Sequence, residues 1–225
     1  MQDQRADLEW RTGDVPVSTR FDDPYFSLEN GLAETRHVFL DGNRLPARFR
    51  DGFHIAELGF GTGLNFLCTA LAWTQAGAPG SLRFTSFEAY PMTATDMARA
   101  HAAFPELSAV SEALLSTWRP QRAVTEFGHG ITLEIIIGDA RNALPDWQGQ
   151  ADAWFLDGFS PAKNPDLWGP DLMAQIGAHT LPGGTVATYT AAGSVRRGLT
   201  GAGLRVTRQP GYGRKRHMTV AERPQ

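Results

Sequence analysis

Three acidic residues stand where strand-like apolar runs end. Glu88 ends LRFTSFE, Asp139 closely follows ITLEIII, and Asp157 ends ADAWFLD. A buried carboxylate without a partner is costly, so the packing of a core does not require acids at these places. Carboxylates can accept hydrogen bonds from the hydroxyl and amine groups of a ligand. The pattern favours a ligand site at strand ends, although each acid taken alone is also typical of a helix cap or a turn.

A glycine-rich loop comes before these acids in the chain. The segment ELGFGTGLNF places Gly59, Gly61 and Gly63 between a strand-like run and a helix-like run. Glycine permits a positive φ and lets a ligand approach the backbone closely. Leu64 stands where the dinucleotide fingerprint would need Gly or Ala, and the loop lacks the Gly-Lys-Ser/Thr ending of a P-loop. The alternative is a turn that serves only to reverse the chain.

The loop and two of the acids together suit a nucleoside ligand. Glu88 can accept hydrogen bonds from both ribose hydroxyls, and Asp139 can accept one from the exocyclic amine of adenine. S-adenosylmethionine fits this pattern, whereas NAD fits less well because the third glycine of its pyrophosphate turn is missing. Asp157 lies in the proline-rich stretch FLDGFSPAKNP, where it is either a tight-turn residue or part of a site.

The elements that must position these residues alternate between strand and helix. The strand-like runs are 53–58, 82–88, 131–137, 151–157 and 183–190, and the helical patterns are 64–77, 92–104, 106–118, 165–180 and 193–202. This alternation predicts an α/β fold with a mostly parallel sheet and helices on both faces. The runs LRVTRQ and KRHMTVA predict a C-terminal antiparallel hairpin. In such folds ligands bind at the carboxyl ends of the strands.

The turn-rich residues 1–50 predict an irregular N-terminal extension of short strands and loops. We expect this extension to pack on a domain formed by residues 51–225, which gives one structural domain overall. The 225 residues are 42% hydrophobic and carry a formal net charge of −3, as is usual for a globular protein. No apolar run approaches the roughly 20 residues that span a bilayer. We therefore expect a cytoplasmic protein without membrane contact, in which the single cysteine, Cys68, is a small buried residue.

The C-terminal quarter of the chain is locally basic. Residues 172–221 contain no Asp or Glu, and they contain seven positively charged residues: Arg196, Arg197, Arg205, Arg208, Arg214, Lys215 and Arg216. Guanidinium groups bind phosphate in a bidentate manner, so this distribution favours a phosphate-rich partner. The alternative is a solvated face that happens to be basic.

Several segments together carry a family resemblance, which begins at about Phe21 and covers nearly the whole chain. The matching segments are DDPYFSLENGLAETRHVFLDGNRL, IAELGFGTGLNFL, SFEAYP, IIIGDAR, DAWFLDGFSPAKNPDLW, TVATYTAAGSVRRGL and GYGRKRHM. In these segments the chain resembles the methyltransferase half of the MnmC family, bifunctional bacterial enzymes that modify the wobble uridine of certain tRNAs. The resemblance implies a Rossmann-like class I methyltransferase. It also implies that S-adenosylmethionine methylates the primary amine of 5-aminomethyl-(2-thio)uridine in the anticodon stem-loop.

The sequence departs from the bifunctional enzymes because it lacks their second, flavin-dependent half. We expect no FAD, no metal and a monomer, in a chain that is either a stand-alone methyltransferase or one half of a longer protein. The source of the amine is left open, and a separate FAD-dependent oxidase is one candidate. Two alternatives remain open. One is a methyltransferase that acts on a small-molecule amine, and the other is an RNA-binding module without catalysis.

The expected site has three sets of residues. Asp157 is the expected catalytic residue, which holds the acceptor amine and could relay a proton. The expected cofactor set takes the loop, the strand-end acids and their neighbours in the matching segments: Tyr25, Phe26, Glu57, Gly59, Gly61, Gly63, Asn65, Glu88, Asp139 and Ala140. The expected substrate set is Phe159, Lys163, Tyr189, Arg196, Arg197, Arg214, Lys215 and Arg216. Phe159 could stack on a flipped base or pack in the core, and Lys163 could contact tRNA or be a solvated turn lysine.

Overall fold

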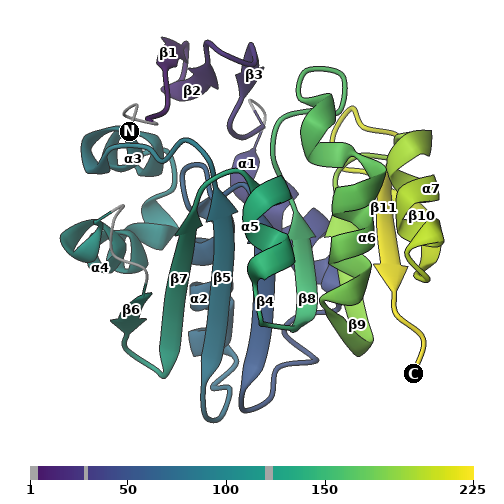
Figure 1. The fold of residues 1–225 in the computed structure, drawn as a ribbon. Coiled ribbons are helices and arrows are strands. Elements are labelled where there is room, and N and C mark those ends of the chain that lie inside the picture. Colours follow the sequence, from purple (N-terminus) through teal and green to yellow (C-terminus); the bar gives the residue numbers. More distant parts are fainter. Residues whose placement is uncertain (1–4, 28–29, 120–123) are drawn as a thin grey trace.

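The fold is built on an eight-stranded sheet in a computed structural model that describes residues 5–27, 30–119 and 124–225 (Figure 1). Five neighbouring strands are parallel: β4 (Phe53–Leu58), β5 (Leu82–Glu88), β7 (Ile131–Ile137), β8 (Ala151–Leu156) and β9 (Thr180–Thr188). The edge strands are antiparallel to their neighbours: β6 (Val124–Phe127) pairs with β7, and β11 (His217–Glu222) pairs with both β9 and β10 (Arg205–Pro210). The strand order is β10-β11-β9-β8-β4-β5-β7-β6. The predicted α/β class with a mostly parallel sheet and a C-terminal hairpin is confirmed.

The register of the parallel strands brings the strand-end residues together. The chain moves from β4 to β5 and β7 on one side and then to β8 and β9 on the other, so the strand order reverses between β4 and β8. Leu58 at the end of β4 is the register partner of both Phe87 and Leu156. The glycine loop, the end of β5 and the turn after β8 therefore leave the sheet side by side. This is the place where open α/β sheets bind ligands.

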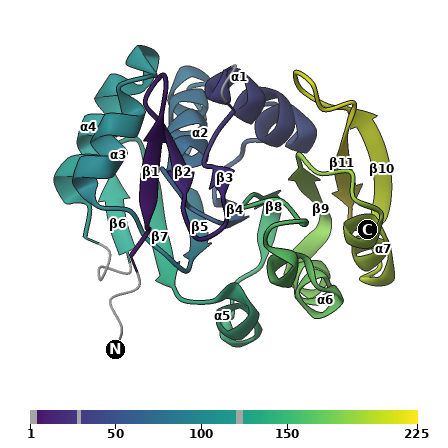
Figure 2. The same cartoon turned by 90° about the horizontal axis from the view of Figure 1, so that it is seen from above.

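Helices cover both faces of the sheet (Figure 2). One face carries α1 (Gly31–Thr35), α2 (Leu64–Gln75) and α4 (Ser108–Thr117), with α3 (Ala94–His101) at its edge, and the other carries α5 (Ala140–Asp146), α6 (Pro170–Ala178) and α7 (Gly193–Gly201). Each face has its own apolar core. Cys68 is buried in the first of these cores, as expected, and burial raises the pKa of its thiol to about 11.

The N-terminal extension lies over the carboxyl ends of the parallel strands (Figure 1). It forms a small antiparallel sheet of β1 (Leu8–Arg11), β2 (Val15–Ser18) and β3 (Asp23–Pro24). The chain then enters α1, which continues as a π-helical turn (Arg36–Leu40) and a 3₁₀ turn (Asp41–Asn43). The prediction of loops for residues 31–43 is wrong. This segment is helical, and its buried residues Leu32, Val38, Phe39 and Leu40 pack it against the sheet.

Two further regular elements, α5 and β6, were not predicted from the sequence. The helix α5 has only seven residues and contains Pro145, so its sequence has no clear helical periodicity of apolar residues. It begins at Asp139, whose side chain caps the backbone N–H of Arg141. The edge strand β6 has only four residues, which are half-buried or exposed, and therefore lacks a strong apolar pattern. In the part of the chain that the structure describes, no helix is long and apolar enough to cross a membrane.

Candidate active site

A cavity of about 790 Å³ lies at the carboxyl edge of the sheet. Its walls come from the glycine loop, the ends of β5, β7 and β8, the N-terminal segment and the turn between β10 and β11. The predicted site residues that line it are Tyr25, Phe26, Gly59, Gly61, Asn65, Glu88, Asp139, Ala140, Asp157, Phe159, Tyr189, Arg214 and Lys215. Residues from opposite ends of the sequence therefore meet in one site.

The glycine loop allows other segments of the cavity wall to approach it closely. Gly59 has a φ of 81°, and a Cβ there would lie 3.2 Å from the backbone oxygen of Asp157. Gly61 has a φ of 54°, and a Cβ there would lie 3.1 Å from the Tyr25 ring. A larger residue at either position would be strained and crowded. The loop is therefore built for a close approach as well as for a turn.

Glu88 joins the end of β5 to the glycine loop. Its carboxylate accepts hydrogen bonds from the backbone N–H of Gly61 at 2.8 Å and of Tyr90 at 2.6 Å. Burial raises the pKa of Glu88, and the backbone N–H donors oppose this effect. A carboxylate has about four acceptor positions, so Glu88 retains lone pairs for a ligand in the cavity. These are the acceptors that a ribose diol needs.

We expect Glu88→Gln to weaken S-adenosylmethionine binding by about tenfold. The amide keeps the size of the side chain, but it replaces one acceptor with a donor and leaves one backbone N–H without its partner. Isothermal titration calorimetry measures the change. Glu126→Gln is the control, because Glu126 is exposed on β6 and does not line the cavity. Equal affinity in the two variants would contradict the role of Glu88.

Asp139 lines the cavity but is already paired. The Arg141 guanidinium binds its carboxylate at 2.6 Å and also bridges to Asp166 at 2.9 Å. The hydrogen bond to Arg141 lowers the pKa of Asp139. Asp139 is thus a helix cap and an ion-pair partner as well as a cavity residue. An adenine amine would use the acceptor positions that Arg141 leaves.

A buried hydrogen-bond network centres on Asn65, the second residue of α2. Its Nδ2 donates to Glu57 and to Asp157, at 2.8 Å each. Its Oδ1 accepts from the Thr35 hydroxyl at 3.0 Å, which keeps the amide nitrogen turned toward the two carboxylates. Glu57 also accepts from Ser86 Oγ at 2.7 Å. One amide group therefore positions two acids at once.

Glu57 does not have the position that was expected of a cofactor ligand. It is fully buried, it does not line the cavity, and burial raises its pKa well above the ordinary value. Its side chain is held in the interior between Ser86 and Asn65, one residue before the end of β4, and this explains the difference. Gly63 also lies outside the cavity lining, because it forms the left-handed cap of α2. Glu57 and Gly63 therefore lie behind the residues that line the cavity.

Asp157 presents a partly desolvated carboxylate to the cavity. Its two oxygens accept hydrogen bonds from the backbone N–H of Gly158 and from Asn65, at 2.8 Å each. Burial raises its pKa to about 6, and these two donors oppose the rise. The Tyr189 hydroxyl donates to the Gly158 carbonyl at 2.7 Å and so holds the turn in place. The Asp157 carboxylate is thus held in one orientation, and its pKa is raised toward neutral pH.

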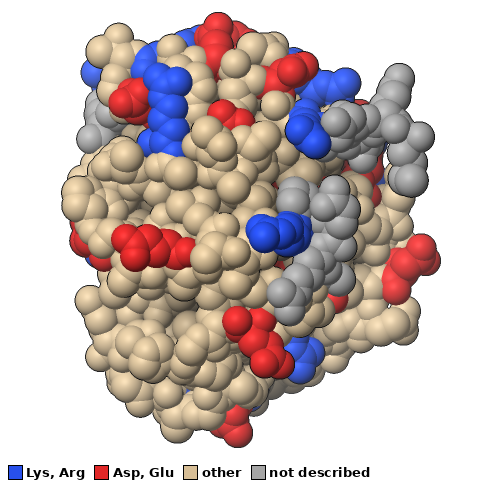
Figure 3. Space-filling model, turned by 90° about the vertical axis from the view of Figure 1, so that its left-hand side faces the viewer, with Lys and Arg blue, Asp and Glu red and all other residues tan. Residues whose placement is uncertain are grey.

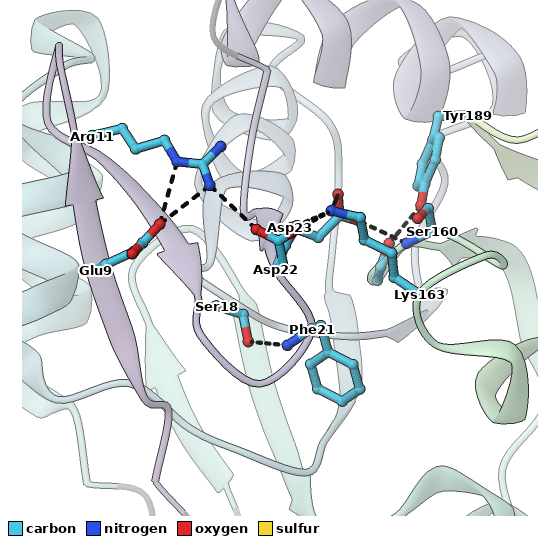
Figure 4. A network of polar contacts seen from close by, with 10 residues as sticks. Glu9, Arg11, Ser18, Phe21, Asp22, Asp23, Ser160, Lys163 and Tyr189 are labelled. Carbon is cyan, nitrogen blue, oxygen red and sulfur yellow. Dashed lines mark hydrogen bonds and ion pairs between the residues drawn. The ribbon is translucent and has the colours of Figure 1, made fainter.

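The N-terminal segment is fastened to the turn after β8 (Figure 4). Asp23 accepts from the backbone N–H of Ser160 at 2.8 Å, and Lys163 pairs with Asp22 at 2.9 Å. Lys163 is an exposed turn residue, as one of its two expectations has it, and its charge is also paired within the protein. These contacts close one wall of the cavity.

Aromatic rings reinforce the same wall. Phe159 stacks on Phe21 with ring centroids 4.7 Å apart, and it meets Tyr25 edge-on at 5.0 Å. Phe159 therefore lines the cavity while packing against the N-terminal segment. Phe26 packs edge-on against Phe104, with their ring centroids 5.2 Å apart.

The basic residues of the C-terminal quarter are divided between two places. Lys215 lines the cavity, where it pairs with Glu34 at 2.7 Å and lies 4.0 Å above the centre of the Tyr189 ring. Arg214 also lines the cavity, whereas Arg196 and Arg216 line a second hollow. Arg197 is exposed on α7 and lines neither hollow. The expected set of basic residues is therefore divided between the cavity, the second hollow and the exposed side of α7.

Sequence reasoning missed several residues of the site. They are Phe21, Asp22, Asp23, Glu34, Thr35 and Ser86. The segments DDPYF and ENGLAET, which belong to the matching stretches, were the only signal for most of them. Their roles depend on contacts between distant parts of the chain. No group of three His, Cys, Asp or Glu side chains among the described residues is placed to hold a metal ion.

A protein-family model of S-adenosyl-L-methionine-dependent methyltransferases matches residues 105–224, more than half of the chain. The chain belongs to this family of methyltransferases. The bifunctional protein MnmC of Pseudomonas aeruginosa strain UCBPP-PA14, named for tRNA 5-methylaminomethyl-2-thiouridine biosynthesis, is 48% identical over 96% of this chain. MnmC of Aeromonas hydrophila is 46% identical over 97% of it. The chain spans only 34% and 35% of the length of these curated relatives, which agrees with a resemblance to one half.

Solved structures share the fold of this methyltransferase. The crystal structure of MnmC2 from Aquifex aeolicus has a TM-score of 0.79 and 25% identity, and the match covers 100% of this chain and 73% of that one. Precorrin-6y C5,15-methyltransferase from Geobacter metallireducens has a TM-score of 0.51 and 12% identity, with 94% and 95% of the two chains covered, and shows the fold alone. The expected Rossmann-like class I architecture is confirmed.

The cavity of this methyltransferase fits the cofactor of its family. S-adenosylmethionine has a ribose diol, an adenine and a charged sulfonium centre. Glu88 offers acceptors for the diol beside a glycine loop that admits a close approach. Asp139 and Ala140 lie at the next strand end in the cavity wall, where the adenine would lie. The carboxylates in this wall suit a ligand with a positive centre.

Proposed function

We propose that this methyltransferase transfers a methyl group from S-adenosylmethionine to the primary amine of 5-aminomethyl-(2-thio)uridine at the tRNA wobble position. The observation that carries the proposal is the place of Asp157. It faces the cavity between the glycine loop and the hairpin turn that carries Arg214 and Lys215. The names of the MnmC relatives supply the substrate class. Tyr25 and Phe26 would close over the cofactor from the N-terminal side.

The acceptor amine must be neutral and correctly aimed when it reacts. A primary alkylamine, with a pKa of about 10.4 when lysine is the guide, is mostly protonated at pH 7. When bound, S-adenosylmethionine supplies the electrophilic methyl group. Asp157 accepts a hydrogen bond from the amine and orients its lone pair, and positioning of this kind can lower a barrier by several kcal/mol.

Two opposing effects act on the proton of the amine. The Asp157 carboxylate stabilises the ammonium form and raises the pKa of the amine. Desolvation by the surrounding aromatic rings lowers it, and Tyr189 and Phe159 both line the cavity. Lys215 is neutralised by Glu34, so it adds little repulsion. We therefore assign Asp157 mainly to orientation, with proton acceptance as its second role.

The rate of methyl transfer should rise with pH in two stages. Asp157 must be ionised to accept from the amine, and its pKa of about 6 means that activity increases as pH rises through that value. A second, larger increase follows as the amine loses its proton at higher pH. A pH profile of kcat/KM measures both stages. A profile that is flat between about pH 5 and pH 7 would contradict the need for an ionised Asp157.

Mass spectrometry of tRNA nucleosides tests the proposed function directly. The tRNA comes from cells that accumulate the aminomethyl form, and it is incubated with the protein and S-adenosylmethionine. The methylaminomethyl nucleoside is expected as the product. Unchanged tRNA together with methylation of free amines would favour the small-molecule alternative. Unchanged tRNA that is bound without any turnover would favour an RNA-binding module.

The remaining partners follow from the substrate. The aminomethyl group must come from another enzyme or from another part of the same polypeptide, and a separate FAD-dependent oxidase is the proposed source. The tRNA anticodon stem-loop is the proposed macromolecular partner, and methyl transfer by this domain should need neither FAD nor a metal. We propose that it acts as a monomer in the cytoplasm.

A further inference from the structure

A second hollow of about 550 Å³ lies outside the active-site cavity. Its lining includes Arg196 from α7, Arg208 from β10, Arg216 from the hairpin turn and His217, the first residue of β11. Among the residues that the structure describes, no acidic side chain lines it. The Arg196 Nε donates to the Ala191 carbonyl at 3.3 Å, which ties this guanidinium group to the backbone just before α7. Three guanidinium groups without an opposing carboxylate make a strong anion-binding feature.

The hairpin lies between this hollow and the active-site cavity. Tyr212, Gly213, Arg214 and Lys215 in its turn line the cavity, whereas residues 206–210, 216 and 217 line the hollow. The two sides of the hairpin also have different neighbours. On the face of the sheet that carries α1 and α2, His37 Nε2 lies 3.0 Å from the Pro210 carbonyl. The helix α7 lies on the opposite face (Figure 2). A polymer that reaches the cavity can continue across the hairpin to the hollow.

We propose that the Arg196–Arg208–Arg216 hollow binds a backbone phosphate of the RNA strand that carries the target base. This inference rests on the proposed function, and it assigns to Arg208 a contact that the basic cluster at 214–216 did not predict. A base that enters the cavity leaves its flanking phosphates outside, on the far side of the cavity rim. Guanidinium groups of fixed geometry bind such phosphates in a bidentate manner. Lys215, which is paired with Glu34, serves the cavity instead.

The charge on another face of the molecule supports this assignment. Figure 3 shows the face at the β6 and α4 edge, where described Lys and Arg side chains are scattered among Asp and Glu and most of the surface carries no charge. The hollow itself, by contrast, is lined by Arg196, Arg208 and Arg216, and it belongs to the segment 172–221, which has no acidic residue. A polyanion is therefore attracted to the hairpin edge of the sheet rather than to the β6 edge.

The test compares two arginines of the same strand. We expect Arg208→Ala to raise the Kd for an anticodon stem-loop RNA with a 5-aminomethyluridine wobble base by about tenfold, and to lower kcat/KM by the same factor. Arg205→Ala is the matched control, because Arg205 is exposed on β10 and does not line the hollow. The slope of log Kd against log salt should decrease by about one in Arg208→Ala and not in Arg205→Ala. Fluorescence anisotropy measures the Kd at several salt concentrations, and calorimetry with S-adenosylmethionine checks that the variants are folded.

The outcomes separate this inference from the proposed function. If wild-type protein methylates the RNA but Arg208→Ala and Arg205→Ala bind it equally well, the phosphate site is overturned and the proposed function stands. If the wild-type protein neither binds nor methylates the RNA, the proposed function fails and the phosphate site fails with it. Arg208→Lys should restore part of the lost affinity, since it keeps the charge without the bidentate geometry.

Discussion

Replacement of Asp157 by alanine is expected to reduce methyl transfer at least about a hundredfold while leaving S-adenosylmethionine affinity unchanged. The reason is the place of this carboxylate. Glu88 binds the glycine loop and Asp139 binds Arg141, whereas Asp157 lies next to the hairpin turn on the acceptor side of the cavity. Loss of Asp157 removes the group that orients the amine, and it leaves the ribose acceptor in place.

The measurement is a single-turnover rate with RNA substrate, together with calorimetry for the cofactor. Asp166→Ala is a matched control, because Asp166 is an acid that also lines the cavity but is exposed and paired with Arg141. It should retain most of the activity. Asp157→Asn keeps the size of the side chain and should lose both most of the rate and the increase in activity near pH 6. An Asp157→Ala variant with full activity would rule out the proposed role.

The order of strands and helices could be predicted because it depends on local patterns. The strands 82–88 and 131–137 agree with the structure residue for residue, since apolar and β-branched runs of this length have few other uses. Asp157, Glu88 and Asp139 were found for a related reason. The carboxyl ends of neighbouring parallel strands meet at one edge, so a position along the chain predicts a position in space.

The parts that escaped prediction depend on contacts over long sequence separations. Asp22 and Lys163 look like solvated turn residues until the fold places them 2.9 Å apart. Glu57 looked like a ligand of the cavity because its strand leads into the glycine loop, but the pleat of β4 turns it into the interior. Periodicity alone does not say which acid of a strand faces the ligand and which one faces its neighbours.

The site contains residues that would contact the ligands and residues that hold them in position. The cavity wall holds the acids that would touch cofactor and substrate. The hydrogen-bond network behind them runs from Thr35 and Asn65 at the wall to Glu57 and Ser86 in the interior. A buried polar network that is fully hydrogen-bonded is rigid, and a partly bonded one is costly. The orientation of Asp157 therefore depends on a residue that we expect to contact the reacting amine only through it. Asn65 is a positioning residue in this scheme.

The Asn65→Leu variant is expected to lower the free energy of unfolding by about 2–4 kcal/mol. Leucine has nearly the same size, but it removes one donor from each of two buried carboxylates and the acceptor of the Thr35 hydroxyl. The pKa values of Glu57 and Asp157 are already raised by burial, and they should rise further without this donor. The increase in activity that wild type shows near pH 6 should therefore move to higher pH.

The pH dependence of stability separates this role of Asn65 from a simple packing defect. An acid whose pKa is higher in the folded than in the unfolded state loses stability as pH rises from the unfolded toward the folded value. The deficit of Asn65→Leu, measured by urea unfolding, should therefore be larger at about pH 8 than at about pH 5. Thr35→Val is the matched control, since it removes one hydroxyl donor from Asn65 and leaves both carboxylate contacts, and it should cost about 1 kcal/mol. A deficit that does not change with pH, with the increase in activity still near pH 6, would mean that Asn65 only fills space and that Asp157 is held by Gly158 alone.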